Sequence, residues 1–443
     1  MSAERHGDRK AAALLRLGLW ILLLLQAPAH AMAPIQHWTT TNGARVYFVP
    51  APDLPMVDVR VVFDAGSARD GKQPGVARLT SALLATGAGE LDADALAEGL
   101  ESVGAELATG ALRDMAWLSL RTLTEPEAYR KAVSLFARIV QQPRFDPEDF
   151  RRERERLLVS LQLDAQKPGA IAEKAFYRAV YGKHPYASPV KGTEQSLKAL
   201  RRADVLAFHR RFYVARNAVV AIVGALDRKQ AEALAARVVG GLPEGEKAPP
   251  LPPVQALTQA VEQRIPHRST QAHVLAGQPG MRRGDPDYFP LYVGNYILGG
   301  GGLVSRISRE VREKRGLSYS AYSYFLPMAR RGPFQMGLQT RADQADEALR
   351  VLRQTLKAFV DKGPSEAEME AAIRHITGGY PLRIDSNRKI LEYVAMIGFY
   401  GLPLDYLERF NERVRAVTRK QVAEAFRRRI HPDRMVTVIV GAE

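Results

Sequence analysis

The sequence carries two copies of one pattern. Near its middle, an amphipathic helical segment precedes a β-branched run that ends at Gly224, and the same order recurs near the C-terminus, ending at Gly441. Gly441 follows Gly224 by 217 positions, and in a second pair of matching segments Thr340 follows Thr122 by 218. Two separate matches at one offset indicate an internal duplication, so we expect two homologous domains.

Each copy combines short strand-like runs with long helical segments. In the first copy, for example, Val57–Phe63 reads as a strand. Short strands grouped between long helices favour an α+β arrangement of layers over a strictly alternating parallel sheet. The parallel alternative stays open at this point.

A proline-rich segment separates the two copies. Residues 242–254 contain five prolines and show neither helical nor strand periodicity, which predicts an extended, semi-rigid connector. We therefore predict an N-terminal domain over residues 35–241 and a C-terminal domain over residues 255–443.

The first 31 residues have the layout of a secretory signal peptide. Four basic residues precede an apolar run from Leu17 to Leu25, and the small-residue segment that follows predicts cleavage after Ala31. The apolar run has nine residues, whereas a membrane-spanning helix needs about 20, so a stable membrane anchor is disfavoured. We expect a periplasmic or secreted product.

The chain has no cysteine and a strongly basic balance. Without cysteine it forms no disulfide and carries no lipoprotein acyl chain. The net charge is +15, and removal of the four basic and two acidic residues of the signal segment leaves about +13, which favours acidic partners. The basic clusters alternate with Glu or apolar helical positions and not with stacking aromatic residues, which disfavours nucleic-acid binding.

A phrase in the second copy, Arg312-Glu-Lys-Arg-Gly-Leu-Ser-Tyr-Ser320, resembles the pitrilysin/insulinase metallopeptidase family. The resemblance covers nearly all of the chain from about Trp38 to the end. It implies two duplicated domains, each with a mainly antiparallel sheet and helices packed on it. The hallmark of the family is an inverted zinc motif, His-x-x-Glu-His, in which two histidines bind zinc and the Glu is the general base.

The zinc site that the resemblance implies is missing from this sequence. The matching segment, residues 75–84, has Arg78 and Ala82 at the two histidine positions and Ser81 at the position of the base. Farther along, Gln162 stands where the last ligand carboxylate is expected. Because a catalytic zinc site needs about three protein ligands, we predict no metal or other cofactor on this chain and expect zinc on a partner subunit.

The resemblance also implies that the second domain supplies an Arg and a Tyr to the scissile carbonyl. The matching residues are Arg315 and Tyr319, whose guanidinium and phenol groups would stabilise negative charge on the carbonyl oxygen. The local pattern predicts a helix over Leu303–Lys314 and a strand over Leu317–Phe325. In the alternative interpretation, Arg315 interacts only with the negative end of the helix and Tyr319 packs in the sheet.

Four glycines, Gly299, Gly300, Gly301 and Gly302, directly precede that predicted helix. Because glycine has no side chain, such a run lets a peptide backbone approach closely, and it resembles the glycine-rich loop of the family. We predict substrate binding there. A phosphate-binding loop is disfavoured because the Lys and Ser/Thr of a P-loop do not follow, and a flexible turn is the remaining alternative.

In the two-chain branch of the family, one subunit carries the zinc motif and the other carries the Arg/Tyr pair. The resemblance therefore implies a subunit that is inactive alone and forms a heterodimer with a zinc-binding homologous subunit. It would enclose an unfolded peptide and lend Arg315 and Tyr319 to its hydrolysis. The alternative is a structural or peptide-binding scaffold of the same fold with no catalytic role.

Overall fold

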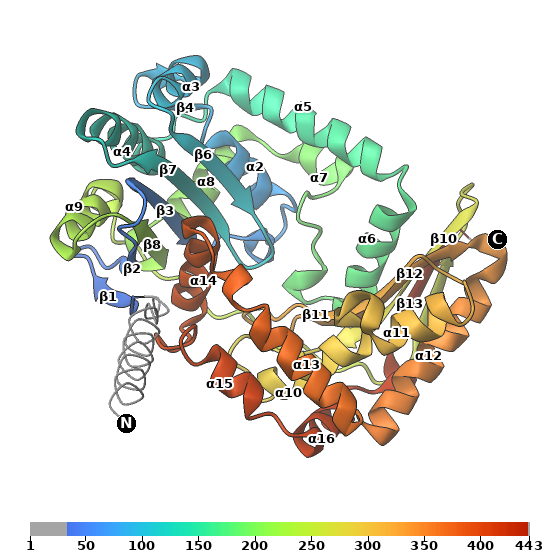
Figure 1. Ribbon diagram of the computed structural model, residues 1–443. Coiled ribbons are helices and arrows are strands. Elements are labelled where there is room, and N and C mark those ends of the chain that lie inside the picture. Colours follow the sequence, from blue (N-terminus) through green and yellow to red (C-terminus); the bar gives the residue numbers. More distant parts are fainter. Residues whose placement is uncertain (1–32, 442–443) are drawn as a thin grey trace, which may run out of the picture. The chain divides into compact units, whose positions relative to one another are not determined.

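The computed structural model describes residues 33–441, and the predicted signal peptide lies outside the described residues. Two sheets form the framework of residues 35–441, one in each half of the sequence (Figure 1). No helix in residues 33–441 combines the length and the apolar character that crossing a bilayer requires.

The first sheet has its strands in the order β1-β2-β8-β3-β7-β6. Strands β2 and β8 run parallel, and the other neighbouring strands run antiparallel. All residues of β8 are buried, because this β-branched strand lies between two others. The strands are β1 (Gln36–Thr39), β2 (Arg45–Pro50), β3 (Met56–Phe63), β6 (Glu106–Ala111), β7 (Ala116–Leu123) and β8 (Ala218–Gly224).

The second sheet repeats this arrangement in the order β9-β13-β10-β12-β11. Strands β9 and β13 run parallel and the other neighbours antiparallel, as in the first sheet. The repeat confirms the predicted duplication and the α+β fold, and the strictly parallel alternative is wrong. The strands are β9 (Val261–Ile265), β10 (Gln271–Pro279), β11 (Ser320–Phe325), β12 (Pro333–Arg341) and β13 (Val436–Val440).

The helices also correspond between the halves. The helix and strand that end at Gly224 are α8 and β8, and their predicted counterparts near the C-terminus are α16 and β13. The first half contains α2 (Val76–Leu83), α3 (Ala93–Glu101), α4 (Pro126–Gln141), α5 (Pro147–Asp164), α6 (Pro168–Tyr181), α7 (Glu194–Ala199), α8 (Arg202–Phe212) and α9 (Arg228–Val239). The second half contains α10 (Tyr288–Asn295), α11 (Arg306–Ser308), α12 (Ala345–Lys362), α13 (Glu366–Gly378), α14 (Asn387–Tyr400), α15 (Phe410–Arg415) and α16 (Arg419–Arg429).

Two equivalent helices are exchanged between the halves. Helix α6 packs on β10 and β13 of the second sheet, whereas α14 packs on β8, β3 and β2 of the first (Figure 1). The contact of α14 is so close that a Cβ on Gly398 would lie 2.6 Å from the Tyr47 ring. Similarly, a Cβ on Gly277 of β10 would lie 2.9 Å from the ring of Phe176 in α6. Each half therefore needs a helix from the other to cover its sheet.

A buried carboxylate joins the two halves at the turn after β6. Asp114 Oδ1 accepts a hydrogen bond from the Tyr186 hydroxyl at 2.6 Å. Its Oδ2 accepts from the Ala329 backbone N–H at 2.7 Å and from the Tyr400 hydroxyl at 2.9 Å. Burial raises the pKa of Asp114, while these hydrogen bonds act in the opposite direction. One side chain thus holds the turn after β11 and the end of α14 against the first half.

The proline-rich connector lies against the protein. Residues 243–258 form neither helix nor strand, in line with the extended segment that was predicted. Leu251 and Val254 are buried, and Arg69 donates a hydrogen bond to the Pro249 carbonyl at 2.7 Å. The domain boundaries that we place around this segment remain a prediction.

Replacing Asp114 by alanine should destabilise the protein by roughly 3–5 kcal/mol, because three donors lose their shared acceptor at once. Urea denaturation measures this as a lower free energy of unfolding. The matched control is Asp53→Ala, at an exposed position, which should change the free energy by less than about 0.5 kcal/mol. Equal stability of the two variants would show that the Asp114 hydrogen bonds do not join the halves.

His209 should make stability fall in mild acid. Burial lowers the pKa of His209 to about 4, and its Nε2 has no hydrogen-bond partner among the described residues. The folded state therefore favours neutral His209. Its contribution to the free energy of unfolding is complete above the pKa of the unfolded state, about 6.5. That contribution falls by about 3 kcal/mol as the pH drops from about 6.5 to about 4, and it stays constant at lower pH.

The test compares free energies of unfolding of the native protein and His209→Gln at pH 7.5 and pH 4. We expect a smaller difference between the two pH values in the variant. The control is His375→Gln, at an exposed position, which should keep the native pH dependence. An unchanged pH dependence in His209→Gln would contradict the prediction.

Candidate functional site

The segment that we predict to correspond to the family's zinc motif forms α2, and it carries no metal-ligating side chain at the predicted positions. Arg78 and Ala82 are half-buried on it, and Ser81 is fully buried. Helix α2 packs against α5, where Gln162 is exposed. Within residues 33–441, no group of three or more His, Asp or Glu side chains is arranged to hold a metal ion.

The segment that leads to Arg315 is helical but irregular. The helix predicted over Leu303–Lys314 is present only in part, as a 3₁₀ turn, the short α11 and a π-helical turn over Arg309–Glu313. A second π-helical turn, Tyr296–Gly300, follows α10. Such turns occur frequently at functional sites.

The predicted strand after Arg315 begins later than the sequence indicates. Strand β11 starts at Ser320 and not at Leu317. The Leu317 N–H is used by the preceding helical turn, since it donates to the Val311 carbonyl at 2.9 Å. The Ser318 hydroxyl then bridges to the Gln339 carbonyl of β12 at 2.7 Å. Arg315 and Tyr319 consequently lie in an exposed turn before the strand.

Arg315 is held by the helical turn that it follows. One terminal nitrogen donates to the backbone carbonyl of Glu310 at 2.8 Å and to its carboxylate at 2.9 Å. Hydrogen bonds from Lys314 and Arg315 lower the pKa of Glu310. For Arg315, the alternative in which the side chain interacts with the end of the helix therefore matches the structure.

Tyr319 behaves differently, because its side chain has almost nothing to pack against. The residue is 93% exposed. The alternative in which Tyr319 packs in the sheet is therefore wrong. An aromatic side chain that is exposed to this degree is available to another molecule.

Three of the four glycines are explained by close packing within the chain. A Cβ on Gly299 would lie 2.5 Å from the Ser323 nitrogen of β11, and one on Gly300 would lie 2.6 Å from the Asn295 amide nitrogen. On Gly301 it would lie 2.7 Å from a backbone oxygen. Gly302 has φ +64° and open space around the Cβ position, so close approach by a peptide is sterically unhindered there.

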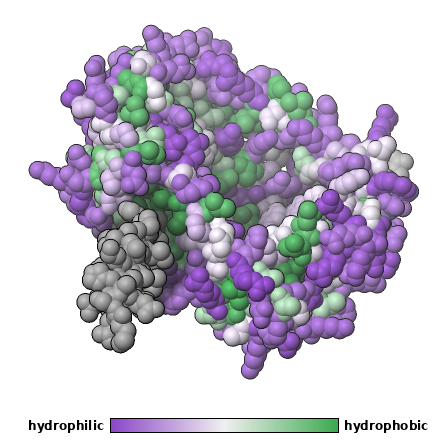
Figure 2. Space-filling view, viewed as in Figure 1, coloured by the Kyte–Doolittle hydropathy of each residue, from purple (hydrophilic) through white to green (hydrophobic). Residues whose placement is uncertain are grey.

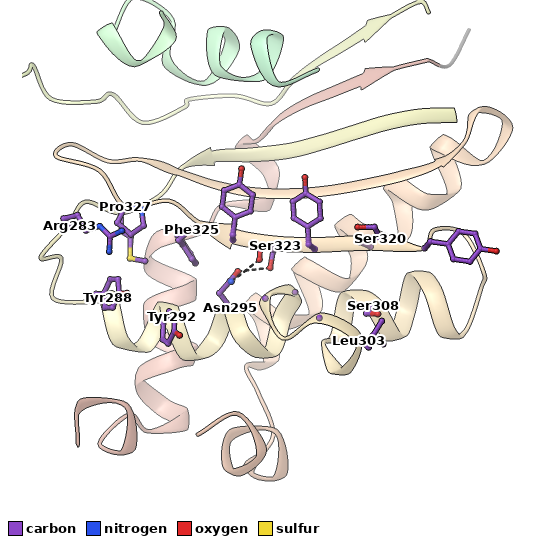
Figure 3. Close-up of a pocket in the computed structure, with 18 residues that line it drawn as sticks. Arg283, Tyr288, Tyr292, Asn295, Leu303, Ser308, Ser320, Ser323, Phe325 and Pro327 are labelled. Carbon is purple, nitrogen blue, oxygen red and sulfur yellow. Dashed lines mark hydrogen bonds between the residues drawn. The ribbon is translucent and has the colours of Figure 1, made fainter. Parts of the chain in front are cut away.

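Asn295 fixes this glycine segment to β11. Its side-chain N–H donates to the Ser323 carbonyl at 3.1 Å, and the Ser323 hydroxyl donates to its side-chain oxygen at 2.8 Å (Figure 3). β11 is the last strand of its sheet, and backbone groups on such an edge are open to pairing with another strand. The glycine segment therefore covers part of this edge.

A cavity of about 540 Å³ lies between the glycine segment and β11. Arg283 and Pro327 lie at one end of it, and Leu303 and Ser308 at the other (Figure 3). The wall is rich in aromatic side chains that carry a polar group, which suit contact with peptides. The tyrosines that line it are Tyr288, Tyr292, Tyr319, Tyr322 and Tyr324.

Arg315 lines another cavity, of about 940 Å³, between the irregular helical segment and α12 and α13. An ion pair closes one wall of it, since Arg306 donates to the Glu368 carboxylate at 2.7 and 2.6 Å. The structure therefore brings Tyr319 to the glycines and to the tyrosine-lined cavity, whereas Arg315 turns away from them.

The architecture of two similar halves agrees with comparisons to known proteins. Residues 45–194 match the family described as insulinase (peptidase family M16), and residues 199–376 match the peptidase M16 inactive domain. A crystal structure described as the peptidase M16 inactive domain from Pseudomonas fluorescens is 39% identical, covering 92% of this chain and 98% of that one, with a TM-score of 0.90. The chain belongs to the peptidase M16 family. Its second half matches the domain that is described as the inactive one of the family, and residues 33–441 contain no group of three or more His, Asp or Glu side chains that could hold a metal ion.

Curated relatives differ in what they are called. An uncharacterized zinc protease of Streptomyces coelicolor is 26% identical over 83% of this chain and 81% of its own length. A protein of Helicobacter pylori named as a non-peptidase homolog is 24% identical over 83% of this chain and 85% of its own length. M16 members similar to this chain therefore carry names of both kinds.

Sequence reasoning missed several residues of this region. Asn295 lies four positions before Gly299, one helical turn away, and that spacing is a signal that was available. Asp114 and Arg283 gave no such signal. The partners of Asp114 in the second half lie 215 and 286 residues away in sequence.

Restoring the family's ligands should restore zinc binding. We expect the triple variant Arg78→His, Ala82→His and Gln162→Glu to bind about one zinc ion per chain, because positions four apart share a helix face and α5 packs on α2. Elemental analysis after dialysis against zinc measures this, with the native chain as the control at less than about 0.1 zinc. The variant should stay without hydrolytic activity, because Ser81 supplies no general base. Absence of zinc from the triple variant would show that α2 and α5 no longer hold the ligand geometry.

Proposed function

We propose that this M16 chain is the zinc-lacking subunit of a periplasmic or secreted heterodimeric metallopeptidase. In this proposal a homologous subunit holds zinc, the two chains enclose an unfolded peptide, and this chain contributes Arg315 and Tyr319 to the hydrolysis. The chain is inactive by itself, because Arg78, Ala82 and Gln162 stand at the ligand positions.

The exposure of Tyr319 is the observation that carries the proposal. A phenol that is 93% exposed adds nothing to the stability of its own chain, and it lies beside a cavity lined with tyrosines. Its hydroxyl is free to donate a hydrogen bond to a group from another molecule. On a developing oxyanion such a donor lowers the barrier of acyl transfer.

Arg315 needs to turn for this role, and the cost of turning is small. It has to leave Glu310, to which it is bound at 2.9 Å. Both side chains are partly exposed, and an ion pair of that kind contributes about 0–1 kcal/mol. A hydrogen bond from Arg315 to the carbonyl oxygen of the peptide would offset that loss, so the contact with Glu310 does not prevent Arg315 from reaching a substrate.

The rival function is that of a peptide-holding scaffold without catalytic duty. The tyrosine-lined cavity and the open position beside Gly302 serve this function equally well, and it gives the Arg315–Glu310 contact a purely structural meaning. The two functions differ in what happens to turnover when the two polar groups are removed.

The decisive experiment reconstitutes this chain with a zinc-motif homologue from the same source and follows cleavage of a quenched fluorescent peptide. Neither chain alone should cleave it, and the mixture should cleave it in a metal-dependent way. In the mixture, Tyr319→Phe and Arg315→Ala should each lower kcat by about 10²–10³-fold, because each removes a donor to the oxyanion. The KM value should change little.

The control is Arg268→Ala, at an exposed position in a loop, which should keep the native kcat. Size-exclusion chromatography checks that every variant still forms the pair. Unchanged turnover in an intact pair would favour the scaffold, and metal-dependent cleavage by this chain alone would overturn the proposal.

A further inference from the structure

A further cavity, of about 600 Å³, lies where the two halves of the chain meet. Its wall includes the turn after β6, from Leu112 to Met115, and the turn after β11, from Leu326 to Met328. The beginning and the end of α14 complete it. Arg283 and Pro327 line this junction cavity and also the tyrosine-lined cavity, so the two are neighbours that share a wall.

The junction cavity has apolar side chains that nothing in the described chain covers. Leu112 is 56% exposed, Leu326 40% and Leu382 69%. Met115, Met328 and Met396 add flexible, polarisable surface, which adapts to differently shaped apolar groups. Exposed apolar residues are ordinary when they are scattered, but a group around one hollow marks a binding site. Figure 2 shows green, apolar side chains in the hollowed middle of one face of the molecule.

Four basic residues line the cavity, Arg113, Arg283, Arg383 and Lys389, against two acidic ones, Asp114 and Glu392. Within residues 33–441, no carboxylate lies within 4.0 Å of the guanidinium nitrogens of Arg113, Arg283 or Arg383. Arg113 lies over the Tyr177 ring, 3.3 Å from its centre. Arg383 lies 5.9 Å from the centre of the Tyr292 ring. Both of these cations have an aromatic face to interact with.

Arg283 is the least satisfied of the three. Its Nε is closed off from solvent and has no hydrogen-bond partner among the described residues, and the Tyr400 ring is at 5.7 Å. Asp114 lines the same cavity, but its carboxylate is already bound by three donors. A bound molecule cannot reach the buried Nε, so its carboxylate would pair with the terminal nitrogens of Arg283, which form no ion pair within residues 33–441. A half-buried cation without a charged partner loses solvation and therefore favours such a carboxylate.

We propose that the junction cavity binds a bulky apolar side chain of an extended peptide, and that Arg283 binds a carboxylate within about two residues of it. An extended chain advances about 3.3 Å per residue, so a peptide that fills the junction cavity continues past Arg283 into the tyrosine-lined cavity. This inference rests on the proposed peptide-holding role and adds the class of peptide, apolar next to acidic. The basic balance of the chain, with a net charge of +15, agrees with an acidic ligand.

The experiment measures binding to this chain alone by fluorescence anisotropy, without a partner and without hydrolysis. The probes are labelled, flexible peptides with a central Phe followed by Glu, Gln or Lys and an amidated end, and one with Ser in place of Phe. A further probe combines Phe and Gln with a free C-terminus, which distinguishes a side-chain carboxylate from a terminal one. The native chain should bind the Phe–Glu peptide about 10–100-fold more tightly than the Phe–Gln peptide.

Substitutions in the chain separate the two contacts. Arg283→Met should abolish the preference for Glu over Gln, and Arg283→Glu should reverse it in favour of Lys. Leu382→Ser should weaken binding of the Phe peptides about tenfold and leave the Ser peptide unchanged. The matched controls are Arg282→Met and Leu54→Ser, both at exposed positions outside the junction cavity, which should bind as the native chain does.

A photoreactive benzophenone side chain in place of Phe locates the apolar group. It should cross-link to Met115, Met328 or Met396. Cross-links elsewhere, or a Glu preference that survives Arg283→Met, would overturn the junction site while leaving the peptide-holding function intact. No measurable binding of any probe would also overturn it, and the function of the pair with a zinc subunit is judged separately by turnover.

Discussion

The two halves of this molecule depend on one buried carboxylate. Asp114 accepts hydrogen bonds from Tyr186, from the Ala329 backbone and from Tyr400. Two of these donors lie in the second half. Asp114 follows β6, an edge strand of the first sheet, and it fixes the turn after β11, an edge strand of the second sheet. Burial raises the pKa of Asp114, and the hydrogen bonds from these three donors act in the opposite direction. The cavity at the junction of the halves has its shape because this contact holds both turns.

The exchange of α6 and α14 is a second interaction that holds the two halves together. A duplicated unit that covered its own sheet would leave the two copies free to separate. Here each sheet is covered by the equivalent helix of the other copy. The contacts at Gly398 and Gly277 are so close that there is space for a hydrogen atom only. Each half is therefore held to the other by a helix that crosses between them.

Local pattern was enough to predict much of this fold. The repeated helix and strand that end at Gly224 and Gly441 were predicted from one offset, and the structure has both. The exchange of helices was not predictable, because the sequences of α6 and α14 do not say which sheet they cover. The irregular helix before Arg315 was missed for a related reason. Its π-helical turn depends on the bond between Leu317 and Val311 and on the position of β11, which are tertiary features.

Of the candidate site, too, one part can be predicted from the sequence and another part only from the structure. The prediction that the zinc ligands are lost depends on the residue types at Arg78, Ala82 and Gln162, so it can be made from sequence alone. The role of the glycines is a property of distances, and the structure assigns most of them to packing against Asn295 and Ser323. Fewer positions therefore remain open to a ligand than the motif suggested. They are the space beside Gly302, the exposed ring of Tyr319 and the unpaired guanidinium of Arg283. All three line one cavity, and Arg283 also lines the neighbouring junction cavity, so a single extended chain is the simplest molecule that reaches all of them.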